Sequence, residues 1–152
     1  MNEQMPRILM VEDSASLAAV YQAYLQDDPY RVLTADSLGG ARDALGSFQP
    51  DIVLLDIELP DGNGMDLLAD VGQLRAPPRV IVMTAHGSSD LAEEAVRRGA
   101  SDFLTKPFDV HEVRLVVHMA LRTAEQTVEL SNLESQISRW YDVEQVVGAS
   151  SV

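Results

Sequence analysis

The residues of this chain that could do chemistry each follow a short apolar segment. They are three acids, a hydroxyl and a cation: Glu12, Asp13, Asp56, Thr84 and Lys106. Taken alone, Asp56 fits equally well a solvated acid at the end of a strand. If the apolar segments are parallel strands, however, their carboxyl ends lie side by side, at the edge where open α/β sheets bind ligands. The five residues would then meet at one point.

Such a group contains the parts that phosphoryl transfer needs. Carboxylates at close range repel one another, and a hard divalent cation relieves that repulsion; Mg²⁺ suits one or two carboxylates together with waters and phosphate oxygens. An ammonium and a hydroxyl can bind the phosphoryl oxygens, whose charge has to be compensated. A carboxylate can itself be the nucleophile, because aspartyl phosphates are recognised covalent intermediates. We therefore expect Mg²⁺ as the cofactor.

The elements that would position these residues are predicted by the order of apolar segments. Ile52 to Leu55 is apolar without alternation, which is typical of a strand buried on both faces. Pro60, Gly62 and Gly64 then predict a loop. The predicted strands are 7–11, 30–35, 52–55, 79–83 and 101–104. Because a helical stretch follows each strand, we expect an α/β fold, doubly wound around a five-stranded parallel sheet.

The predicted helices have recognisable starts and apolar faces. Residues that can cap three of them are Ser14, Ser37 and either Ser88 or Ser89. Apolar residues at three- and four-residue spacing, among them Leu17, Val20 and Val96, predict the faces that these helices turn to the sheet. Gly99 is expected just past the end of the fourth helix.

Composition and charge exclude several classes of function. The 152 residues contain no cysteine, so disulfides and thiolate metal sites are excluded. With 24 acidic against 11 basic residues, the net charge of −13 argues against nucleic-acid binding by this chain. No segment approaches the ~20 apolar residues of a membrane helix, and the N-terminus lacks the apolar run of a signal peptide. We expect a cytoplasmic protein that binds neither nucleic acid nor membrane.

The segment from Asp109 to about Trp140 predicts one extended C-terminal helix with two apolar stripes. The first suits packing on the sheet and consists of Val113, Val116, Val117, Ala120 and Leu121. The second has the a/d spacing of a coiled-coil seam and consists of Leu130, Leu133, Ile137 and Trp140. A helix of this length would project past the domain, so we expect a homodimer through this seam. The alternative is an amphipathic end that folds back on its own domain.

From Arg7 to Leu121 the chain resembles the receiver domain of two-component response regulators. Four motifs, each at the end of a predicted strand, carry the resemblance: Val11-Glu12-Asp13, Leu55 to Gly62, Met83-Thr84-Ala85 and Asp102 to Pro107. Each motif is weak alone, but all four in order are specific. The resemblance implies a flavodoxin-like (CheY-like) sheet of strand order 2-1-3-4-5, and a histidine kinase or histidine phosphotransfer protein as the partner that phosphorylates this domain.

The resemblance also assigns roles in the site. It implies that Asp56 is the phosphoacceptor. Asp13 and Asp56 would bind Mg²⁺ through their side chains, Glu12 through water and Glu58 through its backbone carbonyl. Lys106 and Thr84 would hold the phosphoryl oxygens.

The same resemblance assigns roles to three further residues and a conformation to one peptide bond. Phe103 matches the aromatic switch that turns inward when the threonine moves, although by itself it fits a plain core phenylalanine. Glu58 and His86 stand where receivers tune dephosphorylation, although a lone exposed histidine usually has no such role. A cis peptide is implied before Pro107.

Within the family, the chain is most similar to NtrC-type activators, which act with sigma-54, and especially to their LuxO-like quorum-sensing branch. Such proteins continue through a linker helix into an AAA+ ATPase and a DNA-binding domain. We therefore expect a receiver domain at 1–122, and a linker helix with the start of an absent AAA+ module at 123–152. No Walker-type phosphate loop is present, so we expect no nucleotide hydrolysis. The resemblance implies a phosphoacceptor signalling domain and not an enzyme, with at most self-phosphorylation and autodephosphorylation.

Two other functions compete with a phosphorylation-controlled receiver. A degenerate receiver would act only as a binding and dimerisation module, against which the intact Asp56, Thr84 and Lys106 argue. A phosphatase of the haloacid-dehalogenase type also uses Asp, Mg²⁺ and Lys, and Asp56-Ile57-Glu58 superficially resembles its paired acids. That motif normally follows the first strand, however, and its second acid is Asp.

Overall fold

The centre of the molecule is a sheet of five parallel strands. The computed structural model describes residues 5–85 and 87–122. The sheet has the order β2-β1-β3-β6-β7 and consists of β1 (Arg7–Val11), β2 (Arg31–Ala35), β3 (Ile52–Asp56), β6 (Arg79–Thr84) and β7 (Asp102–Thr105). This confirms the predicted doubly wound α/β fold, and the strand order is the expected 2-1-3-4-5 when only these strands are numbered.

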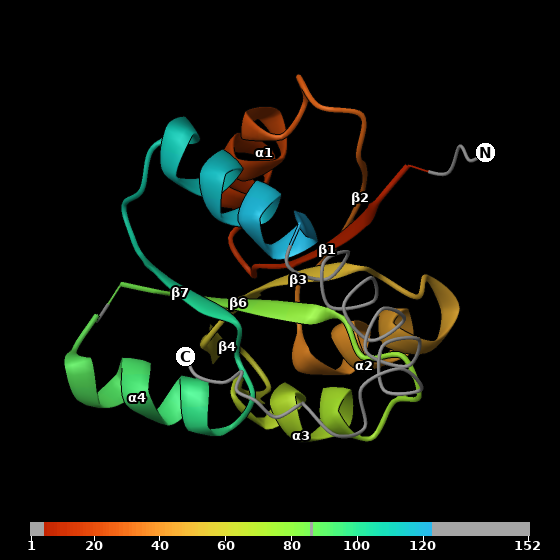
Figure 1. The fold of residues 1–152 in the computed structure, drawn as a ribbon. Helices are drawn as coiled ribbons and strands as arrows, with labels where there is room; N and C mark the ends of the chain where they lie inside the picture. Colours follow the sequence, from red (N-terminus) through yellow and green to blue (C-terminus); the bar gives the residue numbers. More distant parts are fainter. Residues whose placement is uncertain (1–4, 86, 123–152) are drawn as a thin grey trace, which may run out of the picture. The chain divides into compact units, whose positions relative to one another are not determined.

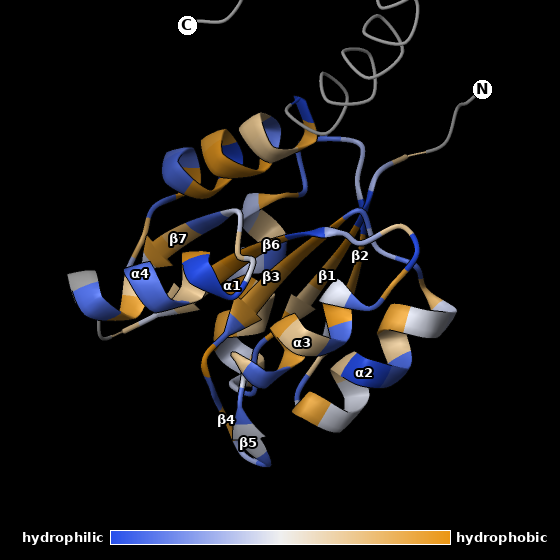
Figure 2. Cartoon of the chain, turned by 60° about the horizontal axis from the view of Figure 1, so that its bottom comes forward, coloured by the Kyte–Doolittle hydropathy of each residue, from blue (hydrophilic) through white to orange (hydrophobic). Residues whose placement is uncertain are grey.

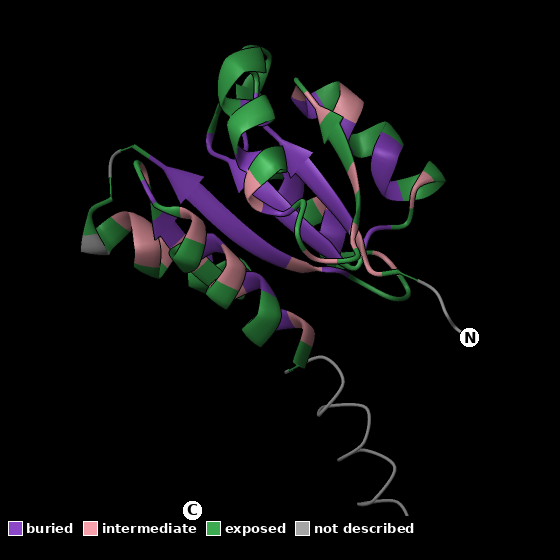
Figure 3. Cartoon of the chain, turned by 90° about the horizontal axis from the view of Figure 1, so that it is seen from above, coloured by how far each residue is buried: buried purple, intermediate pink, exposed green. Residues whose placement is uncertain are grey.

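Helices cover both faces of this sheet (Figure 1). One face carries α1 (Ala15–Tyr24) and a C-terminal helix that begins at residue 110 and is described to residue 122. The other face carries α2 (Leu38–Ser47), α3 (Asp66–Gly72) and α4 (Ser89–Arg97). Successive strand residues pack on opposite faces: Ile8 lies under α1, whereas Leu9 lies under α2. Buried apolar strands therefore lie between two helical layers, and the exposed and hydrophilic residues of these layers face outward (Figures 2 and 3).

Serine side chains begin three of the helices. Ser14 Oγ accepts the N–H of Leu17 at 3.2 Å, and Ser37 Oγ accepts the N–H of Gly40 at 3.0 Å. Ser88 takes this role at α4, where it accepts the N–H of Leu91 at 3.1 Å, so Ser88 and not Ser89 is the cap. Gly99 follows α4 with φ of 110°, a conformation that favours glycine.

Two of the predicted apolar helix faces include residues that are exposed in the structure. Leu17 is 37% exposed and Val20 43% exposed, because α1 turns Ala18 and Tyr21 to the sheet instead. Val96 is 58% exposed, because α4 is anchored by Ala95. A helix resting on a flat sheet buries a narrow stripe, so apolar residues beside that stripe remain in contact with water.

The loop after β3 also contains a small element that was not predicted. Strands β4 (Glu58–Leu59) and β5 (Gly62–Asn63) form an antiparallel hairpin with Pro60 and Asp61 at its turn. Strands of two residues show no hydrophobic alternation, so the sequence pattern indicated only a loop.

The sheet and its helices belong to a compact unit that ends at Leu121. The segment 123–152 lies outside the described residues, so its assignment as a linker stays a prediction. Over the part of the chain that the structure describes, no helix is both long and apolar enough to cross a membrane.

Candidate functional site

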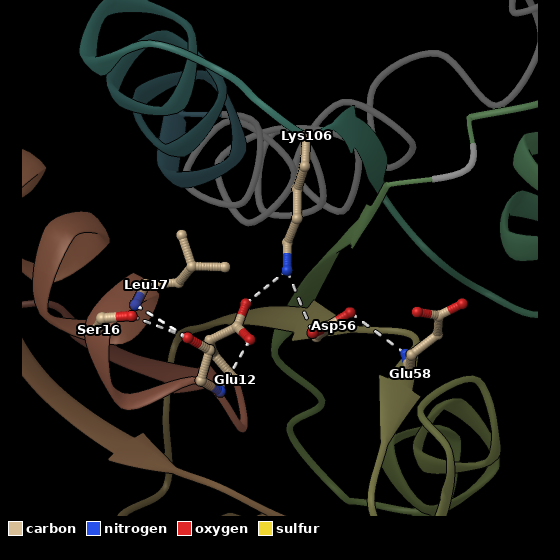
Figure 4. Close-up of polar contacts among 7 residues, drawn as sticks. Glu12, Ser16, Leu17, Asp56, Glu58 and Lys106 are labelled. Carbon is tan, nitrogen blue, oxygen red and sulfur yellow. Dashed lines mark hydrogen bonds and ion pairs between the residues drawn. The ribbon is translucent and has the colours of Figure 1, made fainter.

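Three of the predicted site residues meet at the carboxyl ends of the strands. Glu12 follows β1, Asp56 ends β3 and Lys106 follows β7. Lys106 Nζ lies 2.6 Å from Glu12 Oε1 and 3.2 Å from Asp56 Oδ2, so a single ammonium bridges two carboxylates (Figure 4). All three side chains are withdrawn from solvent: Glu12 is 1% exposed, Asp56 9% and Lys106 13%.

The register of the sheet brings these residues together. Asp56 is the partner of Met83 in the β3–β6 ladder, and Ile57 continues the ladder by donating its N–H to the Met83 carbonyl at 3.2 Å. Thr84 comes next on β6 and is buried. Its carbonyl accepts the backbone N–H of Lys106 at 2.8 Å, which places the start of the Lys106 side chain beside the end of β6.

The acids at this edge have the donor set of a divalent cation site. Glu12, Asp13 and Asp56 each offer a carboxylate oxygen, and these oxygens lie within 4.8 Å of one another. Asp13 is exposed, so the cluster is open to water on that side. The second oxygen of Glu12 accepts the N–H of Ser14 at 3.1 Å. Carboxylates and water are the ligands that Mg²⁺ prefers, so the residues present fit the expected cofactor.

Burial and the neighbouring charges shift the pKa values of Glu12 and Lys106. Burial raises the pKa of Glu12 above its usual range, and the hydrogen bond from Lys106 only partly opposes that rise. Burial alone would lower the pKa of Lys106, but the hydrogen bond to Glu12 and the charge of Asp56 outweigh it, so the pKa is raised. Lys106 is therefore held as an ammonium beside the two acids.

The structure places the remaining predicted residues as follows. The Glu58 backbone N–H donates to Asp56 Oδ1 at 3.2 Å, so Glu58 is tied directly to Asp56. Phe103 is partly buried against the core on the α2–α4 face. The peptide between Lys106 and Pro107 is cis. One of the two predicted tuning residues and the predicted dimer seam lie outside the described residues: His86, Leu130, Leu133, Ile137 and Trp140.

Two groups of residues around the site were not predicted. Phe108 stacks on Tyr21 with ring centroids 4.6 Å apart, and Lys106 Nζ lies 5.9 Å from the Tyr21 ring centroid. The place of Tyr21 next to Lys106 has no local sequence signal. Asp61 binds the N-terminus of α2 through its carboxylate, a contact across 23 residues that no periodicity reveals.

Comparisons with known proteins agree with this geometry. Residues 8–118 match the response regulator receiver domain family. The regulatory protein LuxO of Vibrio cholerae is 43% identical over 115 residues, which cover 76% of this chain and 25% of that protein. The chain thus spans about a quarter of the length of the curated relatives it matches.

Solved structures show the same likeness. The signal receiver domain of a LuxO repressor protein from Vibrio parahaemolyticus is 37% identical, with a TM-score of 0.79 over 84% of this chain and 98% of that one. The beryllofluoride-activated NtrC4 receiver domain, solved as a dimer, is 33% identical with a TM-score of 0.74, over 78% of this chain and 98% of that one.

Proposed function

The chain belongs to the response regulator receiver domain family, and from that premise we propose that it is a phosphorylation switch. Asp56 is the phosphoacceptor, a histidine kinase or histidine phosphotransfer protein is the donor, and Mg²⁺ is the cofactor. The observation that carries the proposal is the contact of Lys106 Nζ with both Glu12 and Asp56, beside the exposed Asp13. A nucleophile, a cation site and an ammonium at one point meet the needs of phosphoryl transfer to a carboxylate.

In the proposed step, an Asp56 carboxylate oxygen attacks the phosphorus of a phosphohistidine. The bond between phosphorus and the imidazole nitrogen breaks, and the imidazole leaves. Mg²⁺, when bound, compensates charge on the phosphoryl oxygens. Asp13 and Asp56 would hold this ion by their carboxylates, Glu12 through water and Glu58 through its backbone carbonyl.

The other site residues bind the phosphoryl group on Asp56 and respond to it by a conformational change. Lys106 binds a phosphoryl oxygen with the ammonium that now faces Asp56, and Thr84 binds another with its hydroxyl. Movement of Thr84 toward the phosphoryl group lets Phe103 turn inward, which changes the surface around α4, β7 and the C-terminal helix. Glu58 and His86 tune the rate at which the aspartyl phosphate is hydrolysed.

The domain acts by signalling, and its output lies in further parts of a longer protein. We propose a cytoplasmic regulator of the NtrC type in which the receiver state controls dimerisation. Through 123–152, it would also control an AAA+ ATPase and DNA-binding module that act with sigma-54. The likeness to LuxO proteins, whose names mark them as regulatory, supports a regulatory output, and the resemblance to their quorum-sensing branch extends the proposal to quorum sensing.

The test is incubation with acetyl phosphate and Mg²⁺, followed by intact-mass measurement. We expect a single phosphoryl adduct on the wild-type protein. The adduct should be absent from Asp56→Asn, because an amide is a poor nucleophile, and absent when EDTA removes the metal ion. Circular dichroism of Asp56→Asn confirms that the fold is retained.

The other outcomes select the competing functions. A folded wild-type protein without an adduct contradicts the proposal and leaves a degenerate receiver that acts as a binding module. Steady turnover of a phosphate ester such as p-nitrophenyl phosphate would instead identify a phosphatase. The position of Asp56 on β3, and not on the first strand, speaks against that last alternative.

A further inference from the structure

The loop that follows Asp56 is fixed to the phosphoacceptor strand at its far end. Gly64 donates its N–H to the Ile57 carbonyl at 2.6 Å. Its backbone lies so close to Asp56 that a Cβ atom at this position would collide with the Asp56 carbonyl oxygen. A side chain at residue 64 would therefore push the loop away from the end of β3, so only glycine fits here.

The tip of the same loop is fixed to α2. Asp61 Oδ1 accepts the N–H of Leu38 at 2.7 Å, and Asp61 Oδ2 accepts the N–H of Gly39 at 3.0 Å. These are amides of the first turn of α2, which have no partner within the helix. The local cap Ser37 satisfies a third amide, that of Gly40, at 3.0 Å. The start of α2 is thus capped twice, once locally and once by the loop.

Asp61 is ionised when it makes these contacts. The two backbone hydrogen bonds, first that from Leu38 and then that from Gly39, hold the pKa of Asp61 below its usual range. A carboxylate at a helix N-terminus also faces the positive end of the helix dipole. The anchor is therefore charged throughout the neutral pH range.

The hairpin connects this anchor to the site. Asp61 is a turn residue of the β4–β5 hairpin, in which Glu58 pairs with Asn63 and Leu59 with Gly62. Glu58 in turn donates its N–H to Asp56 Oδ1. A displacement at the tip therefore moves the Glu58 backbone, which contacts the phosphoacceptor directly.

We infer that Asp61 is a positioning residue of the metal site: by binding the N-terminus of α2, it holds the 58–64 loop so that the Glu58 backbone faces the acid cluster. The inference rests on the proposed function, which assigns the Glu58 carbonyl to Mg²⁺. Asp61 acts through the loop and does not itself touch the ion or the phosphoryl group.

The test compares Asp61→Asn with Ser37→Ala by calorimetric titration with Mg²⁺ alone. Both changes weaken the capping of α2, but only the first loosens the loop. We expect Asp61→Asn to bind Mg²⁺ about three- to tenfold more weakly, below the ~10–100-fold loss typical of groups that hydrogen-bond a ligand directly. Asp61→Ala, which removes both acceptor oxygens, should bind Mg²⁺ more weakly still. Ser37→Ala should keep the wild-type affinity.

A rate measurement separates positioning from chemistry. At saturating Mg²⁺, phosphorylation of Asp61→Asn by acetyl phosphate should reach about the wild-type maximal rate, because uniform loss of binding leaves the maximal rate unchanged. The Mg²⁺ concentration for half-maximal rate should rise by the same factor as the dissociation constant.

Three results are distinguishable. If Ser37→Ala loses as much affinity as Asp61→Asn, the effect comes from α2 stability and the inference is wrong. If Asp61→Asn and Asp61→Ala bind Mg²⁺ like the wild type, the loop needs no anchor and the inference is also wrong. If the wild-type protein binds no Mg²⁺, the proposed function itself fails, and the inference fails with it.

Discussion

At the residue scale, the decisive feature is one ammonium group set between two buried carboxylates. Lys106 is the single lysine among the 152 residues. Its contacts with Glu12 and Asp56 compensate two charges that would otherwise repel each other in a poorly solvated place. The same ammonium is the group we assign to a phosphoryl oxygen, so it serves both the stability of the resting domain and the proposed chemistry.

This arrangement predicts the effect of removing the charge. Without Mg²⁺, Lys106→Met should lower the free energy of unfolding at pH 8 by about 2 kcal/mol, less than the ~3–5 kcal/mol of fully buried pairs because Asp13 opens the site to water. The measurement is urea unfolding in EDTA. Lys106→Arg keeps the charge, so its free energy of unfolding should fall by less than about half of this amount.

The pH dependence follows from the raised pKa of Glu12. A folded-state pKa above the unfolded value means that the folded state binds the proton more tightly. Protonation of Glu12 therefore stabilises the fold as the pH falls through the range between the folded-state and the unfolded-state pKa. Removing Lys106 takes away the hydrogen bond that opposes the rise of the Glu12 pKa. In the variant, the pH range in which protonation of Glu12 stabilises the fold therefore extends to higher pH. The stability deficit of Lys106→Met should therefore shrink between pH 8 and pH 5. A deficit that is equal at both pH values would contradict the assignment to this pair.

At the element scale, the C-terminal helix is held on the domain by a polar contact as well as by its apolar stripe. Val113 and Val117 are fully buried on the sheet. Beside them, Arg114 Nε and Nη2 donate to the two oxygens of Asp28, at 3.0 and 3.3 Å. Asp28 lies in the turn between α1 and β2 and is largely withdrawn from solvent. The paired geometry favours one register of the helix against this turn.

This contact can be compared with an exposed one in the same chain. Arg114→Met should lower the free energy of unfolding, because Asp28 loses two charge-assisted hydrogen bonds. Arg42→Met removes an ion pair with Asp70 whose two side chains are 48% and 41% exposed, and urea unfolding should show a smaller loss of stability than in Arg114→Met.

Hydrogen exchange locates the effect of the Arg114 change. Amides of residues 110–122 should exchange faster in Arg114→Met than in the wild type, whereas those of β1 and β3 should keep their protection. Uniformly faster exchange over the whole sheet would show that the contact supports general stability and not helix docking.

At the scale of the whole molecule, the fold followed from the sequence because a parallel sheet leaves strong local marks. Segments such as Ile52–Leu55 are apolar on both faces, and capping serines stand before three of the helices. The errors lie where no such mark exists. The β4–β5 hairpin is too short to alternate, and Leu17 and Val20 fit an apolar helix face although α1 turns Ala18 and Tyr21 to the sheet instead.

The site was predictable to the extent that it depends on strand ends. Glu12, Asp56 and Lys106 follow or end strands, so the topology alone brings them together. The Tyr21–Phe108 stack and the binding of Asp61 to α2 depend on tertiary packing between distant segments. A single sequence contains no periodic signal for such contacts, and they were therefore missed.

Self-association of this chain is expected to depend on the apolar seam predicted near its C-terminus. Leu133 belongs to the predicted seam Leu130, Leu133, Ile137 and Trp140, which lies outside the described residues. Leu133→Asp would place a charge in an apolar contact, and should weaken dimerisation at least about tenfold, since losing one buried leucine already costs more than the ~1.4 kcal/mol of a tenfold change. Phosphorylation of Asp56 should be unaffected. Sedimentation equilibrium before and after treatment with acetyl phosphate measures both states.

Ser135→Asp is the matched control, because it adds the same charge outside the seam and should leave the dimer intact. An unchanged dimer in Leu133→Asp would contradict the seam. A wild-type protein that is monomeric in both states, together with a loss of stability in Leu133→Asp, would instead support the alternative that this segment folds back on its own domain. Because the dimer and the folded-back segment compete for the same apolar stripe, the two measurements together decide which of them uses it.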